Sequence, residues 1–251
     1  MTMYLENWLK RSALAGIYLL PFIALVFSND LIFPFVTARN LLFRAITELM
    51  FCAWLGLALL DPAYRPARSR LLLVLIGFTV WIGLADLFSL NPGKSFLGSF
   101  ERMEGYITTL HLLLYFIVTG SMLRTARQWH TLFTVNIASS LAVVALMLAD
   151  ETLRTGFASE WRLEGTLGQA SYLAVFMLFS GFFTLLVLTR TRDKRWLTAG
   201  LLAALCVQLA VLFMTATRGA VLGLLAGLAL AIGYWLLTSR SRILAMLASH
   251  T

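Results

Sequence analysis

Charged residues are scarce in this sequence: Asp, Glu, Lys and Arg make up 13% of its 251 residues, whereas hydrophobic residues make up 60%. A soluble domain of this length needs far more charge to cover its surface. The aromatic content of 13%, with seven Trp, is typical of proteins whose helix ends lie among lipid headgroups. The composition therefore argues against a soluble globular domain and predicts a membrane protein.

Cysteines and acidic residues are also few. Cys52 and Cys206 lie inside apolar segments without metal-ligand spacing, so we expect two small packing or lipid-facing residues and no metal site. Acidic residues number 12 against 20 basic ones, a net charge of +8. Because the basic residues stand in short clusters between apolar runs, they indicate membrane-protein loops rather than a nucleic-acid partner.

A small-x-small cleavage site is missing after the first apolar stretch, Ala13 to Phe27, so we expect an uncleaved helix rather than a signal peptide. Eight runs approach the roughly 20 residues that a helix needs to cross a bilayer. These predicted spans are 13–28, 40–60, 71–90, 107–123, 131–149, 170–188, 197–214 and 219–237. The connections are too short for separate soluble domains, so we expect one all-α transmembrane bundle over 1–251.

Basic residues predict the orientation of this bundle. With the N-terminus in the cytoplasm, thirteen of the 20 Lys and Arg residues fall on cytoplasmic segments, and every inner connection is basic. Eight spans then place both termini on the cytoplasmic side of the membrane. Nine of the 12 acidic residues fall on the outer side or inside helices, which directs the search for function to the outer face.

Four ionisable residues are predicted within the outer parts of three spans: Arg44, Glu48, Asp86 and His111. Charged groups in a span usually face a bundle interior or a water-filled cavity. The i,i+4 spacing of Arg44 and Glu48 allows them to pair on one helix face. Two interpretations stay open: a shared polar cavity, or a packing pair with a histidine that bonds a carbonyl.

Two outer loops resemble each other. Ser99-Phe-Glu-Arg-Met-Glu-Gly105 and Ser159-Glu-Trp-Arg-Leu-Glu-Gly165 both contain Arg-apolar-Glu-Gly and lead into a predicted helix. Arg102 and Arg162 each offer a planar guanidinium suited to phosphate or carboxylate. Glu104 is the acidic partner in the first loop. The pair of loops makes an anionic ligand a reasonable hypothesis.

Two helix starts on the outer side also favour an anion. Gly165 and Gly168 permit a tight turn before the sixth span, and Thr166 or Ser171 can cap its amides. Arg218 stands at the start of the eighth span. The alternative is that such arginines only anchor helix ends. Further along this span, Gly219, Gly223 and Gly227 form a small-residue stripe, which we expect to pack inside the bundle.

Three segments carry a family resemblance. Arg162-Leu-Glu-Gly-Thr-Leu-Gly-Gln-Ala-Ser-Tyr-Leu173 and Thr215-Ala-Thr-Arg-Gly-Ala220 resemble the O-antigen ligase and polymerase-like superfamily. Phe100-Glu-Arg-Met-Glu-Gly105 is similar to a ligase-like branch. The resemblance implies an enzyme without metal or cofactor that transfers a glycan from a polyprenyl-diphosphate carrier to an acceptor at the periplasmic face. The acceptor would be lipid A core, a protein or a growing chain.

The resemblance also implies site residues. Arg162 and Arg218 match the family's diphosphate-binding arginines, and two guanidiniums would neutralise charge on the leaving group. Gly165, Thr166 and Gly168 would shape the adjacent turn, with Arg102 and Glu104 as weaker candidates. Gln169 replaces the family's usual asparagine. Members commonly have about a dozen spans and a catalytic histidine in a large periplasmic loop, so we expect this chain to be a truncated, N-terminal portion. His111 is a weak substitute for that histidine.

Two other functions stay open on the sequence. Arg44, Glu48, Asp86 and His111 would also suit a transporter or flippase for an anionic substrate. Transporters usually carry charge nearer the bilayer midplane, which is largely apolar here. The other open function is that of a non-catalytic assembly partner in an envelope complex.

Overall fold

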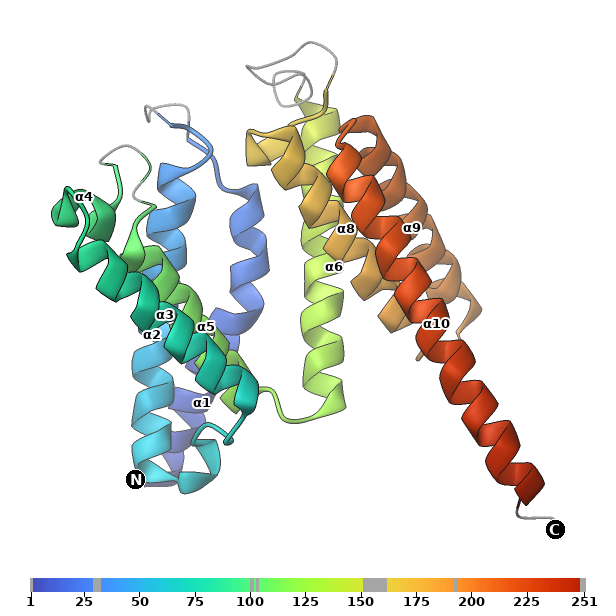
Figure 1. The fold of residues 1–251 in the computed structure, drawn as a ribbon, viewed down its shortest axis with the longest axis horizontal. Helices are drawn as coiled ribbons and strands as arrows, with labels where there is room; N and C mark the ends of the chain where they lie inside the picture. The colour runs from blue at the N-terminus through green and yellow to red at the C-terminus, as the bar shows by residue number, and fades with distance from the viewer. Residues whose placement is uncertain are drawn as a thin grey trace.

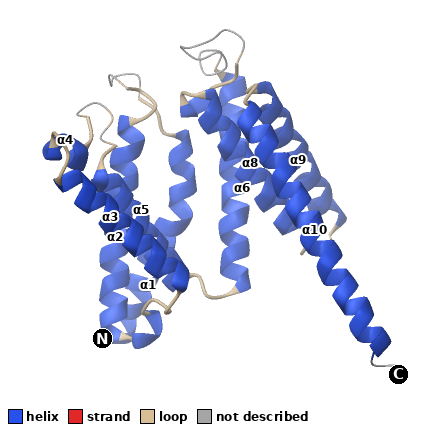
Figure 2. Cartoon of the chain, in the orientation of Figure 1, coloured by secondary structure: helices blue, strands red, loops and turns tan. Residues whose placement is uncertain are grey.

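The computed structural model describes residues 2–28, 33–99, 102, 104–150, 162–191 and 194–248, with side chains between residues 4 and 238. Every regular element in these ranges is helical (Figure 2). The α-helices are α1 (Thr2–Leu19), α2 (Thr37–Leu60), α3 (Arg70–Leu87), α4 (Pro92–Leu97), α5 (Tyr106–Met122), α6 (Ala126–Ala149), α8 (Ala170–Leu188), α9 (Arg195–Met214) and α10 (Arg218–Ala248). Three short 3-10 helices join them: η1 (Leu20–Leu25), η2 (Pro62–Tyr64) and η3 (Gly165–Leu167).

The predicted all-α polytopic bundle is confirmed. Seven helices are long and apolar enough to cross a membrane among the described residues. The remaining predicted span, 107–123, is the shorter helix α5 of 17 residues. At 1.5 Å per residue α5 extends about 25 Å, somewhat less than the roughly 30 Å hydrocarbon core.

The long helices alternate in direction along the chain, and α5 completes the alternation (Figure 1). The start of α1 and the end of α10 lie at the bottom of the view, so the two ends of the chain share one side. We call the opposite end, at the top of Figure 1, the distal face. Residues 33–36, 102, 104, 162–169 and 215–217 all lie near this face.

The first span departs from a regular α-helix. α1 ends at Leu19, and the chain continues as the 3-10 helix η1, with Pro21 at its start. Proline lacks a backbone N–H and its ring crowds the preceding turn, so the α-helical hydrogen-bond pattern stops there. The freed carbonyls become available to side chains, and the Ser139 hydroxyl from α6 donates to the Pro21 carbonyl at 2.6 Å.

Other helix ends follow local sequence signals. Thr125 and Gln128 form a capping box that starts α6. The Asn91 side chain accepts a bond from the Lys94 amide at the start of α4, with Pro92 at the first helical position. The predicted third span, 71–90, extends past the end of α3, which stops at Leu87, shortly before α4 begins.

Among the residues that the structure describes, three clusters of buried apolar side chains form the core. The first joins α1, α2 and α5 and includes Ile17, Met50 and Leu57; the second joins η1, α6, α8 and α9. The third lies between α6, α8 and α9, around Ile137 and Leu201. α3 contributes only Thr79 to the buried set, so most of its surface faces lipid or another protein.

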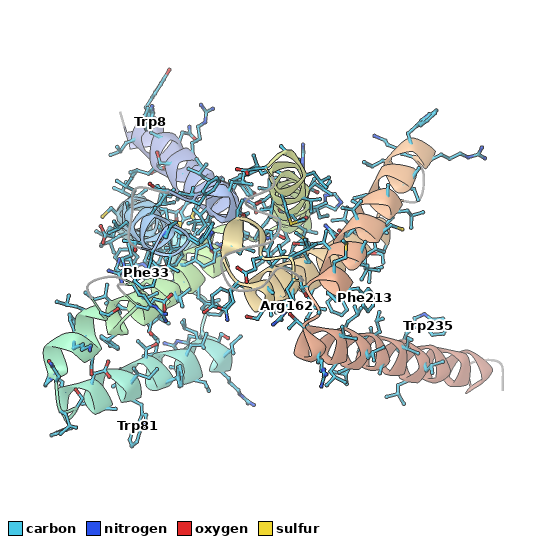
Figure 3. The ribbon with its side chains drawn as sticks, turned by 90° about the horizontal axis from the view of Figure 1, so that it is seen from above. Trp8, Phe33, Trp81, Arg162, Phe213 and Trp235 are labelled. Atoms are coloured by element: carbon cyan, nitrogen blue, oxygen red, sulfur yellow. The ribbon has the colours of Figure 1, made fainter. Side chains whose placement is uncertain are left out.

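The surface bears large side chains that point outward. Trp8, Trp81 and Trp235 project away from the bundle in the view from above (Figure 3), and each is more than 60% exposed. Such side chains suit a bilayer environment. In the stripe on α10, a Cβ on Gly223 would lie 3.3 Å from Leu178, and one on Gly227 would lie 2.5 Å from Phe182. These two glycines therefore pack against α8, whereas Gly219 faces open space.

Candidate functional site

The turn before α8 depends on two glycines. Gly165 and Gly168 have φ of +60° and +69°, a left-handed conformation that glycine adopts without strain. A Cβ on Gly168 would lie 2.4 Å from the Phe35 ring, so the residue also permits close approach of segment 33–36. The turn thereby directs residues 162–164 toward α10 and residues 167–172 toward segment 33–36.

Arg162 joins this turn to the start of α10. Its Nε donates to the Thr215 carbonyl at 2.9 Å, and its Nη2 donates to the Thr217 hydroxyl at 3.1 Å. Arg218, an exposed residue, follows directly as the first residue of α10. The structure therefore brings Arg162 and the segment around Arg218 together across 53 positions of sequence, at the distal face (Figure 3).

The expected cap of α8 by Thr166 is wrong, because no side chain in the described part of the chain caps this helix and Thr166 instead has a structural role in the turn before it. Its side chain is fully buried, and its hydroxyl donates to the Ala24 carbonyl of η1 at 2.7 Å. The Thr166 carbonyl accepts a 2.7 Å bond from Arg39 Nη2. Arg39 also donates to the carbonyls of Ile23 and Val26. Thr166 and Arg39 together satisfy carbonyls around the interrupted first span and fix the turn against it.

Glu164 is the buried carboxyl of the site, with 5% of its surface exposed. Burial raises the pKa of Glu164, and the nearby Arg162 guanidinium partly offsets this by favouring the ionised form. A carboxyl with a raised pKa gains a proton more readily than an exposed one, so Glu164 is a titratable group within the candidate site.

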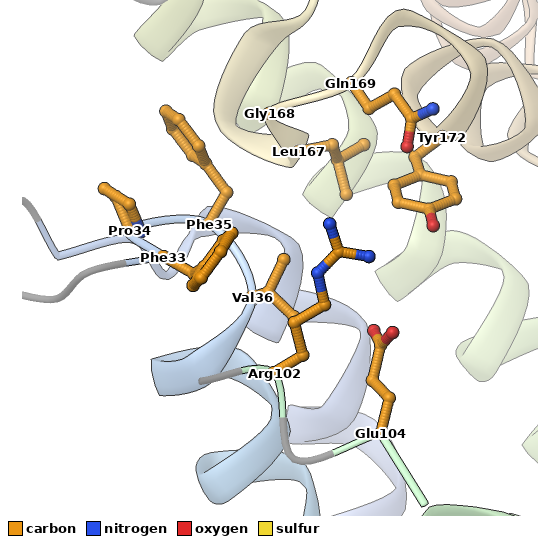
Figure 4. Close-up of a pocket in the computed structure, with 10 residues that line it drawn as sticks. All are labelled: Phe33, Pro34, Phe35, Val36, Arg102, Glu104, Leu167, Gly168, Gln169 and Tyr172. Carbon is orange, nitrogen blue, oxygen red and sulfur yellow. The ribbon is translucent and has the colours of Figure 1, made fainter. Parts of the chain in front are cut away.

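A pocket of about 240 Å³ lies beside the turn (Figure 4). Its walls come from segment 33–36, from Arg102 and Glu104, and from residues 167–172 at the start of α8. Arg102 extends between Val36 and Leu167 in the close-up, and the Glu104 carboxylate points toward the same space. The predicted loop candidates Arg102, Glu104 and Gly168 thus line one pocket.

The backbone of the first loop is fixed from α2. The Asn40 amide donates to the Arg102 carbonyl at 2.9 Å, and the Arg102 guanidinium lies 5.4 Å from the Phe33 ring centre. Gly98 and Gly105 pack backbone to backbone. A Cβ on Gly98 would lie 2.5 Å from the Glu104 amide nitrogen, and one on Gly105 would lie 2.3 Å from the Gly98 nitrogen. Phe100, Glu101 and Met103, and residues 159–161 of the second loop, lie outside the described residues.

The intramembrane charges of α2 also form bonds to another helix. Nε2 of His111 lies 3.0 Å from Glu48 Oε1, and its Nδ1 lies 2.7 Å from the Ile107 carbonyl oxygen. Arg44 Nη2 donates to the Thr108 hydroxyl at 2.8 Å. The ionisable side chains of α2 therefore bond across to α5, and His111 is joined both to a carbonyl and to a carboxylate.

Asp86 lies apart from Glu48 and His111. It lines a separate cavity of about 510 Å³ between α3, α4 and α5, with Gly83 and Tyr106. The walls of that cavity are largely apolar side chains. The structure therefore brings Arg44, Glu48 and His111 together and places Asp86 on the other side of α5.

Sequence reasoning did not identify Arg39, Gln169 and Tyr172 as candidate site residues. Arg39 had a visible signal, an arginine at the start of an apolar run, but its carbonyl partners depend on the interruption at Pro21. Gln169 and Tyr172 line the pocket with Gly168. Within the described ranges, His, Cys, Asp and Glu form no group of three that could hold a metal ion.

Comparison with known proteins gives no relative: the chain matches no protein-family model, no curated protein and no solved structure. The functional argument therefore depends on the residues of the distal face.

Proposed function

We propose that the chain is an O-antigen ligase-like membrane glycosyltransferase acting on a polyprenyl-diphosphate-linked glycan. The distal face would then be periplasmic, in a bacterial inner membrane. The observation that carries this proposal is the bonding of Arg162 to Thr215 and Thr217, directly before Arg218. It joins the two segments that resemble the family.

The chemistry of this arrangement suits a diphosphate leaving group. Arg162 and Arg218 both supply permanent positive charge at the distal face, and Arg218 lies at the positive end of the α10 dipole. Charge that develops on a departing diphosphate is stabilised by guanidiniums already fixed in place, because little reorganisation is then needed during the reaction. The Arg162 bonds to Thr215 and Thr217 provide such fixation.

The test uses membranes that contain the complete gene product with Arg162→Lys or Arg218→Lys. Transfer of a polyprenyl-diphosphate-linked glycan to lipid acceptor is measured at saturating and limiting donor. We expect each variant to lower the transfer rate at least tenfold, because lysine keeps the charge but loses the planar fork. Arg124→Lys, at the opposite end of the bundle between α5 and α6, is the matched control.

Transfer at the wild-type rate in both Arg162→Lys and Arg218→Lys would refute the diphosphate proposal. Arg218 is the sharper test, because its side chain is exposed and its replacement leaves the Arg162 bonds in place. Movement of the carrier across the bilayer without glycan transfer would instead support a flippase.

A further inference from the structure

Three polar side chains of α2 follow one another at four-residue steps, and each bonds to α5 or to the segment that leads into it. Asn40 donates to the Arg102 carbonyl at 2.9 Å, and Arg44 donates to Thr108 at 2.8 Å. Glu48 lies 3.0 Å from His111. Each step descends about 6 Å along the helix axis. These residues, which we call the polar edge, therefore run from the rim of the distal pocket down into the span.

Glu48 ends the polar edge in an unusual setting. It lies 11 residues, or about 16 Å, below the first residue of α2, within a helix of spanning length. Its side chain is 64% exposed, whereas that of His111 is 9% exposed. An ionised carboxylate facing lipid costs about 3 kcal/mol, so such a group is protonated, paired or hydrated. Glu48 has a paired oxygen and a large exposed surface.

The hydrogen bonds of His111 determine how many protons the Glu48–His111 pair holds. The Ile107 carbonyl can only accept, so Nδ1 of His111 donates to it at 2.7 Å. The contact between Nε2 and Glu48 Oε1 then needs one proton between them. That proton resides on the imidazolium beside a carboxylate, or on the carboxyl beside a neutral imidazole. The pair is neutral in both forms.

Other titratable groups near the pair are few among the described residues. Arg44 lies one turn above Glu48 on α2, and Tyr115 lies one turn below His111 on α5, against Phe43. α3 contributes Asp86, in its separate cavity. α1 packs on α2 at this level through uncharged residues such as Gly16. Arg44 is thus the one neighbouring permanent charge in the described part of these helices.

We propose that Glu48 and His111 form a proton-binding site that exchanges with the aqueous phase at the distal face along the polar edge. On release the proton passes from the pair to a water molecule, which becomes hydronium, and the pair is left with one negative charge. Uptake reverses this step. The proposal is independent of glycan transfer, since it requires neither Arg162 nor Arg218.

The first test measures aqueous access. In a Cys206→Ser background, Glu48→Cys is exposed to a membrane-impermeant thiol reagent on the distal side of intact cells. We expect the new thiol to react. The parent chain, which keeps Cys52 one turn further along α2, is the matched control and stays unlabelled. No reaction at position 48, or equal labelling of the parent, would overturn the aqueous route.

The second test measures the proton itself. Histidine-labelled full chain in lipid nanodiscs is titrated by NMR, and the His111 signal is identified by its loss in His111→Asn. We expect Glu48→Gln, which keeps an acceptor oxygen at Oε1, to change the proton affinity of His111 at least tenfold. Asp86→Asn, the control carboxylate, leaves the titration unchanged. A His111 signal that never titrates, or titrates identically in Glu48→Gln, would overturn the proposal.

Discussion

Gly168 combines a left-handed backbone with a close contact, so its replacement by alanine has two costs. The new Cβ would lie 2.4 Å from the Phe35 ring, at a φ of +69° that side chains rarely adopt. We expect Gly168→Ala to lower the free energy of unfolding by about 2 kcal/mol or more, measured by thermal unfolding in detergent. Gly120→Ala on α5, where a Cβ meets open space, is the control and should be neutral or stabilising. Equal stability of Gly168→Ala and wild type would contradict the turn geometry.

Glu164 predicts a pH dependence with a definite sign. Its pKa in the folded chain is raised above the ordinary value of 4.5, mainly by burial. Ionisation is therefore harder in the folded state, and folding loses stability as pH rises through 4.5 and then through the raised value. We expect the melting temperature of wild type to fall relative to Glu164→Gln between acidic and neutral pH. A difference that is constant across this range would show that Glu164 titrates as an exposed carboxyl.

For single residues, the sequence predicted which side chains belong to the candidate site better than it predicted which groups they contact. Arg162, Gly165 and Gly168 could be proposed because arginine and glycine have distinctive chemistry and backbone freedom. The bond between Glu48 and His111 could not be proposed, because helix spacing relates Glu48 only to residues of its own helix, such as Arg44, whereas His111 lies on α5. Contacts between helices depend on packing that periodicity does not specify.

At the scale of whole elements, a buried polar chain connects α6, α8 and α9. Gln208 donates to Ser140 at 2.8 Å and accepts from Thr184 at 2.8 Å, and all three side chains are fully buried. Ser180 extends the chain to Asn136. Hydrogen bonds between helices hold membrane bundles together because apolar surface gives little preference for helix over lipid.

Replacing Gln208 by leucine tests this connection. Ser140 and Thr184 keep bonds to the carbonyls of Ile137 and Ser180, so few groups lose every partner. We therefore expect Gln208→Leu to cost only about 1 kcal/mol of unfolding free energy. Val207→Leu, one position away on the same helix, is the control. Unfolding in a graded detergent series measures both, and a loss several times larger would contradict this expectation.

Helices themselves were the most predictable elements, because long apolar runs have few alternatives in a bilayer. Their ends were less so. The predicted first span, 13–28, begins well inside α1, because the polar residues before it continue the helix. Its other end becomes η1 because Pro21 stops the regular pattern and Arg39, Thr166 and Ser139 supply bonds to the carbonyls there. The end of this span could not be predicted from its own sequence, because the bonds that stabilise it come from three other segments of the chain.

For the whole molecule, the alternation of helices places both ends of the chain on one side (Figure 1). Basic residues at that side bond to local carbonyls: Arg65 Nε donates to Ala58, and Arg124 Nε donates to Ser121. Lys10 and Arg124 also lie over the Tyr64 ring, at 5.8 and 5.7 Å. Retention of basic residues in the cytoplasm then predicts that this side is cytoplasmic and the distal face exported.

Reporter fusions test separately whether both ends of the chain share one side and whether that side is cytoplasmic. A fluorescent protein that folds only in the cytoplasm should be bright when fused at the N-terminus, after Thr125 or at the C-terminus. A phosphatase active only after export should be active after Asp150, at the distal end of α6. If bright and active positions were exchanged throughout, the fold would stand and the charge argument would fail. If the two termini reported opposite sides, an odd number of crossings would be required, and the short helix α5 would be the first element to re-examine.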